Sequence, residues 1–140
     1  GARRAVLSVA RIACLWSLAT GTFLAVTLIA FEEGVRFLLV PSEAYAEFAT
    51  AWWIACIQMP INALVFATDG IHWGARDYAY LRNSMLVALL AGAASLAAFA
   101  AWVPSLASVW WATALWISLR AIFGLSRIWP GWGRAPLRSP

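Results

Sequence analysis

Four apolar segments of about 20 residues constrain this chain more than any other feature. A helix needs about 20 apolar residues to cross roughly 30 Å of hydrocarbon, and such segments lie near 12–31, 48–69, 83–103 and 106–126. In lipid a helix satisfies its backbone hydrogen bonds internally. The sequence therefore predicts an all-α integral membrane protein with four transmembrane helices, and the short connections predict that neighbouring helices are antiparallel.

Composition favours a membrane protein over a soluble one. The chain has 140 residues, of which 64% are hydrophobic and 11% charged, whereas soluble domains are about half apolar and a quarter charged. Its net charge of +4 comes from arginines that stand at the ends of the apolar segments. Nucleic-acid binders instead gather basic residues on one exposed face. We therefore expect a lipid bilayer as partner and no nucleic acid.

The two ends of the chain are interpreted as follows from their sequence: a spanning helix near the N-terminus and an irregular tail at the C-terminus. Arg3 and Arg4 before an apolar segment resemble the start of a signal peptide, but segment 12–31 is longer than the usual apolar region of about 7–15 residues. A spanning helix is the better interpretation. Because the chain begins at Gly1 and not at Met, we expect either a processed protein or a fragment of a longer one. The tail 127–140 holds three Pro and two Gly and is expected to be irregular.

The connecting segments predict interfacial and loop structure. Residues 35–40 are expected to lie in the membrane interface, and Ser42 is a plausible N-cap of the second long helix. Residues 70–81 are expected to form a loop. The third span is rich in small residues that let another helix approach closely, so this face is expected to pack on protein: Ala88, Ala91, Gly92, Ala94, Ser95 and Ala98.

Arginine distribution predicts the orientation. Nine of the ten arginines fall on one side of the predicted membrane, and only Arg36 falls on the other. Because basic residues are enriched on the cytoplasmic side, both termini are predicted to be cytoplasmic and residues 32–47 periplasmic. The nine are Arg3, Arg4, Arg11, Arg76, Arg82, Arg120, Arg127, Arg134 and Arg138.

One polar stripe in the second span is the main candidate site. At about 100° per residue, Gln58, Asn62 and Asp69 lie on one face of a helix. Polar groups at membrane depth normally face protein or a water-filled cavity, and Pro60 beside them frees a backbone carbonyl at the same depth. These residues are candidates for a substrate or ion pathway. Alternatively, Gln58 and Asn62 simply bond to neighbouring helices.

Asp69 is the strongest single candidate, because an ionisable group inside a membrane is functional by default. Arg120 of the fourth span is expected at a similar depth, where it either pairs with Asp69 or extends its charge to the interface. His72 suggests a proton relay or half a metal site, but a loop-edge histidine is the preferred interpretation. No second histidine or carboxylate cluster accompanies it, so no metal site or cofactor is expected.

Motifs typical of enzymes are missing from this sequence. It has no P-loop, nucleophile elbow, CxxC or HExxH pattern. We therefore expect a protein that is not an enzyme.

The run QMPINALVFATDGIHWGARD at 58–77, followed by Tyr80-Leu-Arg82-Asn83-Ser-Met85, resembles the MATE (multidrug and toxic compound extrusion) family, and within it the DinF-like branch. The resemblance implies the last four helices of a twelve-helix fold. It also implies secondary efflux of cationic or amphipathic compounds in exchange for protons or sodium, in a bacterial inner membrane. Asn62 stands where the NorM-like branch has an acidic residue.

Pro60, Gly70, Gly74 and Arg120 are candidates for structural or gating roles. By the family resemblance, the N-terminal helices of the same transporter are the missing partner, together with a small-molecule substrate. The alternative is a small stand-alone membrane protein that acts as a scaffold or assembles into a homo-oligomeric pore.

Overall fold

The computed structural model describes residues 2–129 and residue 137, with side chains from Arg4 onward. Its elements are α1 (Ala2–Ala30), α2 (Glu32–Leu39), a short 3-10 helix (Ser42–Ala44), α3 (Tyr45–Gly74), α4 (Tyr78–Trp102) and α5 (Leu106–Ile128). Four helices, α1, α3, α4 and α5, are long and apolar enough to cross a membrane. The prediction of an all-α protein with four spans is confirmed, and the described residues contain no strand.

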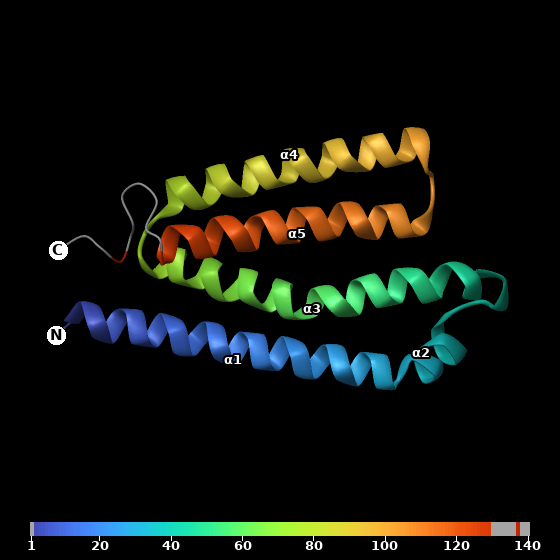
Figure 1. Cartoon of the computed structure of the whole chain (residues 1–140), viewed down its shortest axis with the longest axis horizontal. Coiled ribbons are helices and arrows are strands. Elements are labelled where there is room, and N and C mark those ends of the chain that lie inside the picture. The colour runs from blue at the N-terminus through green and yellow to red at the C-terminus, as the bar shows by residue number, and fades with distance from the viewer. Residues whose placement is uncertain (1, 130–136, 138–140) are drawn as a thin grey trace.

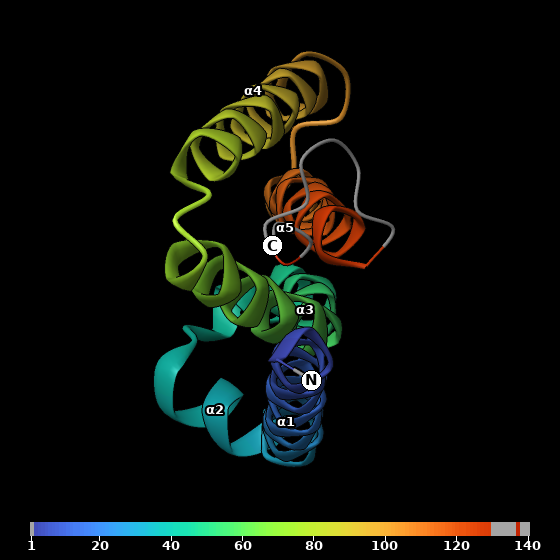
Figure 2. The same cartoon turned by 90° about the vertical axis from the view of Figure 1, so that its left-hand side faces the viewer.

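The four long helices lie side by side in one layer, in the order α1, α3, α5, α4 (Figures 1 and 2). Helices that follow one another in the chain run antiparallel, as predicted. However, α5 packs between α3 and α4, so the central pair α3 and α5 runs parallel. The start of α1 and the end of α5 lie at the same end of the layer, together with the turn between α3 and α4. We call this the terminal end.

A single layer leaves both of its faces open. The accessible surface is 9018 Å², whereas a compact soluble monomer of this mass exposes about 7,100 Å². The buried core is correspondingly small and centres on Val65, Ile117 and Ala121. Large apolar side chains such as Trp16 and Trp102 stay mostly exposed. Lipid or further helices must cover these faces, because water solvates them poorly.

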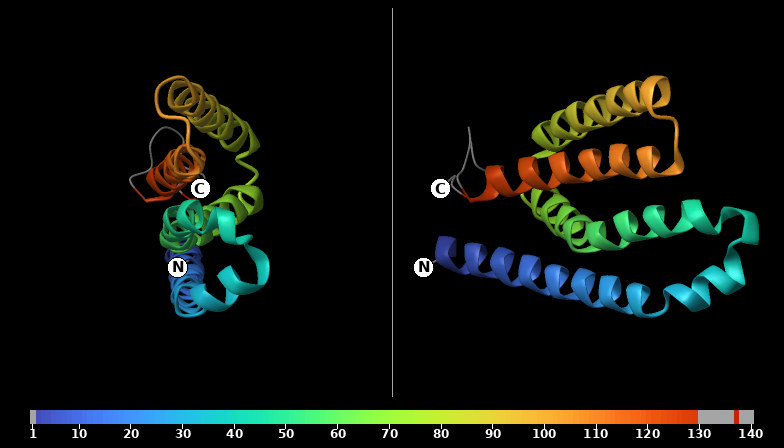
Figure 3. Two further views of the ribbon diagram at one scale, coloured as in Figure 1. Left: turned by 90° about the vertical axis from the view of Figure 1, so that its right-hand side faces the viewer. Right: turned by 45° about the vertical axis from the view of Figure 1, so that its right-hand side comes forward.

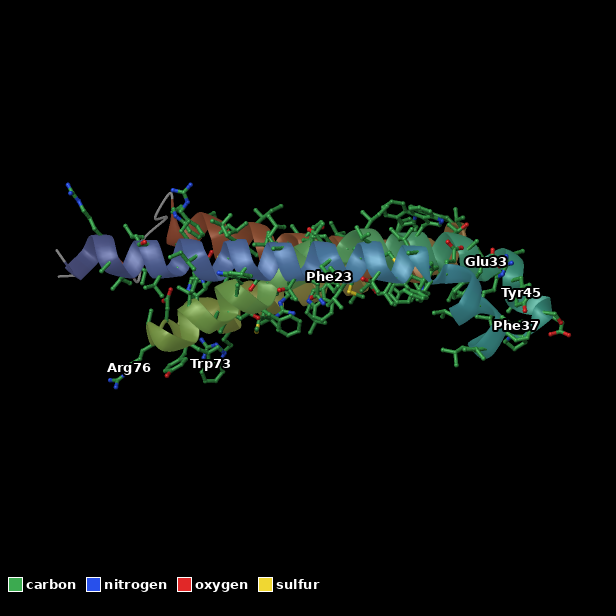
Figure 4. All side chains as sticks on the ribbon, turned by 90° about the horizontal axis from the view of Figure 1, so that it is seen from below. Phe23, Glu33, Phe37, Tyr45, Trp73 and Arg76 are labelled. Carbon is green, nitrogen blue, oxygen red and sulfur yellow. The ribbon has the colours of Figure 1, made fainter. Side chains whose placement is uncertain are left out.

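Most helices extend beyond their predicted spans. α1 begins at Ala2 rather than at residue 12, because a helix does not need to stop where the hydrocarbon does. The loop predicted at 70–81 is wrong: α3 continues to Gly74 and α4 starts at Tyr78, which leaves a turn at 75–77. Arg76 in this turn has a positive φ of 58°. Figure 4 shows Trp73 and Arg76 toward the terminal end of the layer, far from Glu33 and Phe37 at the opposite end.

The connection between α1 and α3 also differs from its prediction. Residues 35–39 of the stretch predicted to lie in the interface belong to the helix α2, whose Phe37, Leu38 and Leu39 are exposed. Ser42 does not cap α3: it belongs to the 3-10 helix, and α3 starts after Ala44 without a side-chain cap. Of the predicted irregular tail, 127–128 are still part of α5, and 130–136 and 138–140 lie outside the described residues.

α3 bends near its middle, where Pro60 stands, but stays one continuous helix (Figure 3). The predicted kink is therefore confirmed, and its cause is the missing backbone donor of proline. α1 packs tightly against α3 here. A Cβ added to Gly21 of α1 would lie 2.8 Å from the Met59 carbonyl oxygen and from the Pro60 Cα. Only glycine at position 21 lets the two backbones approach this closely.

The small-residue face of α4 packs on protein, as predicted. Ala88 and Gly92 are buried, and a Cβ added to Gly92 would lie 3.0 Å from the Trp116 Cβ of α5. Ala94, in contrast, is exposed. The turn into α5 is closed by Ser105, whose Oγ accepts a hydrogen bond from the Ser108 amide at 3.1 Å.

Replacing Gly92 with Leu should destabilise the protein by roughly 1–3 kcal/mol, because the new side chain overpacks the contact between α4 and α5. The measurement is the unfolding midpoint of the full-length protein in detergent. A matched control is Ala94→Leu, whose position on the same helix is exposed. Equal midpoints for Gly92→Leu and wild type would show that this face does not pack against α5.

Candidate functional site

Two members of the polar stripe of α3, Gln58 and Asp69, contact α5. Gln58 is buried, and its Nε2 donates a hydrogen bond to the Trp110 carbonyl at 3.3 Å. Val65 lies on the same face in the core, and Asp69 meets Arg120 one turn further along. Asn62 is half-buried, and no side-chain hydrogen bond of its amide is found among the described residues.

Asp69 and Arg120 form an ion pair between α3 and α5. Arg120 Nη2 donates to Asp69 Oδ2 at 2.5 Å, and the two side chains are 14% and 16% exposed respectively. The guanidinium also lies over the Trp116 ring, 5.2 Å from its centre. Its Nε is buried with no hydrogen-bond partner among the described residues. Of the two interpretations of Arg120, pairing with Asp69 is confirmed and free extension to the interface is wrong.

An open groove of about 1100 Å³ adjoins this pair. Arg120 and Trp116 of α5 line it, together with α4 and the end of α3. Its remaining lining is mostly apolar and includes Trp73, Met85 and Leu89. A second groove of about 520 Å³ lies beside Gln58, between the first half of α3 and α5. One groove therefore lies at each end of the polar stripe, and both grooves are lined mostly by apolar side chains.

The two glycines with predicted structural or gating roles lie in the last turns of α3. A Cβ added to Gly70 or to Gly74 would meet nothing within 4 Å. Packing among the described residues therefore does not require glycine at either position. Their gating role stays a prediction.

His72 is the main surprise of the site. The sequence predicts a loop-edge position for His72, but the residue lies inside α3 and is fully buried. Its Nε2 is 3.3 Å from the Gly124 carbonyl oxygen of α5, and its Nδ1 is 3.3 Å from Asp77 Oδ2 in the turn. The His72 ring also contacts the Tyr80 ring of α4, with 5.5 Å between their centres. The interpretation as an interfacial loop residue is wrong because α3 runs on past Gly70.

Asp77 ties the turn to the end of α5. Arg127 donates to both of its carboxylate oxygens, from Nε at 2.9 Å and from Nη2 at 3.1 Å. Such a bidentate ion pair is stronger and more directional than a single hydrogen bond between the same groups. Tyr80 adds a hydrogen bond from its hydroxyl to the Phe123 carbonyl at 2.9 Å. We call His72, Asp77, Tyr80 and Arg127 the junction cluster.

A close approach of α3 and α5 makes the junction cluster possible. A Cβ added to Gly124 would lie 2.5 Å from the hydroxyl oxygen of Thr68, which is itself fully buried. Glycine at position 124 therefore lets α3 approach α5 and leaves its carbonyl within reach of His72. A glycine inside an apolar segment was the available sequence signal for this contact. Nothing in the sequence indicated the pairing of Asp77 with Arg127, which are far apart along the chain.

The chain is similar in sequence to plant DETOXIFICATION proteins. The chain is 40% identical over 81 residues to Protein DETOXIFICATION 43 of Arabidopsis thaliana, which covers 57% of the chain and 15% of the relative. It is 31% identical over 113 residues to Protein DETOXIFICATION 44, chloroplastic, of the same plant, which covers 79% of the chain and 21% of the relative. Its homologues are DETOXIFICATION proteins.

These DETOXIFICATION relatives support the resemblance to the MATE family, but not a particular branch or a bacterial source. The chain spans about a fifth or less of their length. No family model matches the sequence. No solved structure matches it either.

Proposed function

We propose that this chain is the C-terminal part of a MATE-type secondary transporter of the DinF-like branch. It exchanges cationic or amphipathic compounds for protons or sodium, together with N-terminal helices of the same protein. The observation that carries this proposal is the similarity to DETOXIFICATION 44, which extends over 79% of the chain. As part of a transporter, the chain is proposed not to be an enzyme.

The open faces of the layer support a fragment of a larger bundle. Helices that expose large apolar side chains on both faces pack against other helices or lipid. A complete transporter would supply both. A stand-alone scaffold or homo-oligomeric pore, the alternative function, would have to cover the same faces with copies of itself.

The roles proposed within the site follow from its chemistry. Asp69 carries the charge that changes during transport, and Arg120 is its counter-charge. Gln58 and Asn62 offer amide groups to a substrate or ion along the pathway. Pro60 is the flexible point of α3, because the helix lacks one backbone hydrogen bond there. Gly70 and Gly74 are proposed to allow the last turns of α3 to move during gating.

The proposed location is a bacterial inner membrane, with both termini in the cytoplasm. The described arginines support this orientation, because Arg36 lies at the far end of the layer and the others lie toward its terminal end. The relative DETOXIFICATION 44 is named chloroplastic. A chloroplast membrane is therefore the alternative location.

Transport by the full-length protein tests the proposal. Inverted membrane vesicles that contain it should accumulate a fluorescent cationic dye when a proton or sodium gradient is applied, and adding dye should in turn release the ion. Vesicles without the protein are the control. Dye movement that is independent of both ion gradients and depends only on the dye concentration difference would favour the homo-oligomeric pore instead.

Cysteine labelling tests the proposed orientation. A Cys at position 42, between α2 and α3, should react with an impermeant thiol reagent added outside intact cells, and a Cys at position 79, near the start of α4, should not. Both Ser42 and Ala79 are exposed in the structure. The native Cys14 and Cys56 are buried and serve as the unreactive background. The opposite labelling pattern would reverse the orientation.

A further inference from the structure

The junction cluster contains a buried histidine whose two ring nitrogens both face hydrogen-bond acceptors. A carbonyl oxygen can only accept, so the contact of Nε2 with Gly124 at 3.3 Å requires a proton on Nε2. Nδ1 lies 3.3 Å from a carboxylate oxygen of Asp77, which also accepts. Nδ1 is buried and has no hydrogen-bond partner among the residues that the structure describes. A neutral ring with its proton on Nε2 makes only the Gly124 contact, whereas a second proton on Nδ1 gives the ring a positive charge that faces the Asp77 carboxylate.

The charges around His72 come from every element that packs on it. On α3, Asp69 lies one turn earlier and is already paired with Arg120 of α5. In the turn, Asp77 faces Nδ1 and is held by Arg127, also of α5. Tyr80 of α4 contacts the ring. On α1, which packs along α3, the described charged side chains Arg4 and Arg11 are exposed.

We propose that His72 is a proton-binding site, in which the protonated ring bridges the Gly124 carbonyl and the Asp77 carboxylate. The proton comes from water, passes Asp77, whose side chain keeps 14% of its surface exposed, and bonds to the lone pair of Nδ1. The ring gains one positive charge, and no other bond changes. The bridge joins the end of α3 to α5 and to the turn that leads into α4.

The protonated bridge acts as a latch between α3 and α5. Its contribution to stability is present at acidic pH and is lost as the pH rises and the ring gives up its second proton. As a regulator of α3 movement, the latch rests on the proposed transport function. As a proton-binding site, it rests only on the contacts of His72.

Nitrogen-15 NMR of the full-length protein in nanodiscs tests this proposal. His72 is the single histidine of this chain, and its signals are identified by their loss in His72→Gln. On acidification the ring should change from one protonated nitrogen to two. In Asp77→Asn the doubly protonated ring should be less populated than in the wild type at the same acidic pH, because a carboxylate no longer faces Nδ1. A ring that stays neutral throughout, or an equally populated doubly protonated ring in Asp77→Asn, would overturn the proposal.

Hydrogen exchange provides a second readout if Asp77→Asn fails to fold. After correction for the chemical exchange rate, the amides of the turn at 75–77 should be better protected at low pH than at high pH in the wild-type protein. His72→Gln should remove this pH dependence. Equal protection at all pH values in the wild type would overturn the latch. None of these measurements requires substrate movement, so a failed transport assay leaves them decisive for the proton site.

Discussion

Arg120→Gln should lower the free energy of unfolding by about 3 kcal/mol, because it leaves the Asp69 carboxylate largely buried without its partner. The pair joins two helices at 2.5 Å with only 14% and 16% of the side chains exposed. Asp69→Asn should have a similar cost, since it leaves the guanidinium unpaired. Unfolding of the full-length protein in detergent, followed by tryptophan fluorescence, measures both effects.

The double variant Asp69→Asn, Arg120→Gln should recover most of that stability, because two neutral amides at these positions leave no unpaired charge. A matched control is Arg36→Gln, which breaks the more exposed ion pair with Glu33 near the other end of the layer. That change should cost no more than about 1 kcal/mol. Single variants of Asp69 and Arg120 as stable as wild type would show that the pair is not formed.

Gly21→Ala should destabilise the protein by roughly 1–3 kcal/mol, although alanine normally favours a helix. The new methyl group would lie 2.8 Å from three atoms of α3, two of them backbone atoms of Met59 and Pro60. Backbone atoms cannot rotate away as a flexible side chain can. α1 must therefore move away from the bend of α3. The free energy of unfolding in detergent measures the effect.

Gly70→Ala is the matched control for Gly21→Ala. Gly70 is also inside a helix, but a Cβ there meets nothing within 4 Å. Alanine should therefore be neutral or stabilise the protein by up to about 1 kcal/mol through its helix propensity. If both substitutions changed stability equally, the close contact between α1 and α3 at Pro60 would be absent.

The spans and the polar stripe could be predicted because each depends on a local pattern. Length and hydropathy indicate where a helix crosses the membrane. A rotation of about 100° per residue places Gln58 and Asp69 on one face of the helix. The order of the helices could not be predicted in this way. An apolar segment does not specify which neighbour it packs against, so the position of α5 between α3 and α4 depends on contacts such as Gly124 with Thr68.

The continuation of α3 past Gly70 was missed because glycine and charge are typical of loops. Inside a membrane an unpaired backbone group costs several kcal/mol, whereas glycine costs a helix about 1 kcal/mol. The helix therefore continues to Gly74. This difference also explains the error about His72. One more turn of helix moves its ring from a loop edge to the buried contact with Gly124.

The most direct test of the account is substrate-coupled proton movement by the full-length double variant Asp69→Asn, Arg120→Gln in proteoliposomes, beside the wild type. We expect the wild type to couple the two movements. We expect the double variant to insert and fold normally but to lose the coupling, because no carboxylate at position 69 remains to change its charge. Transport equal to wild type in the stable double variant would contradict the role of Asp69 and reduce the pair to a structural contact.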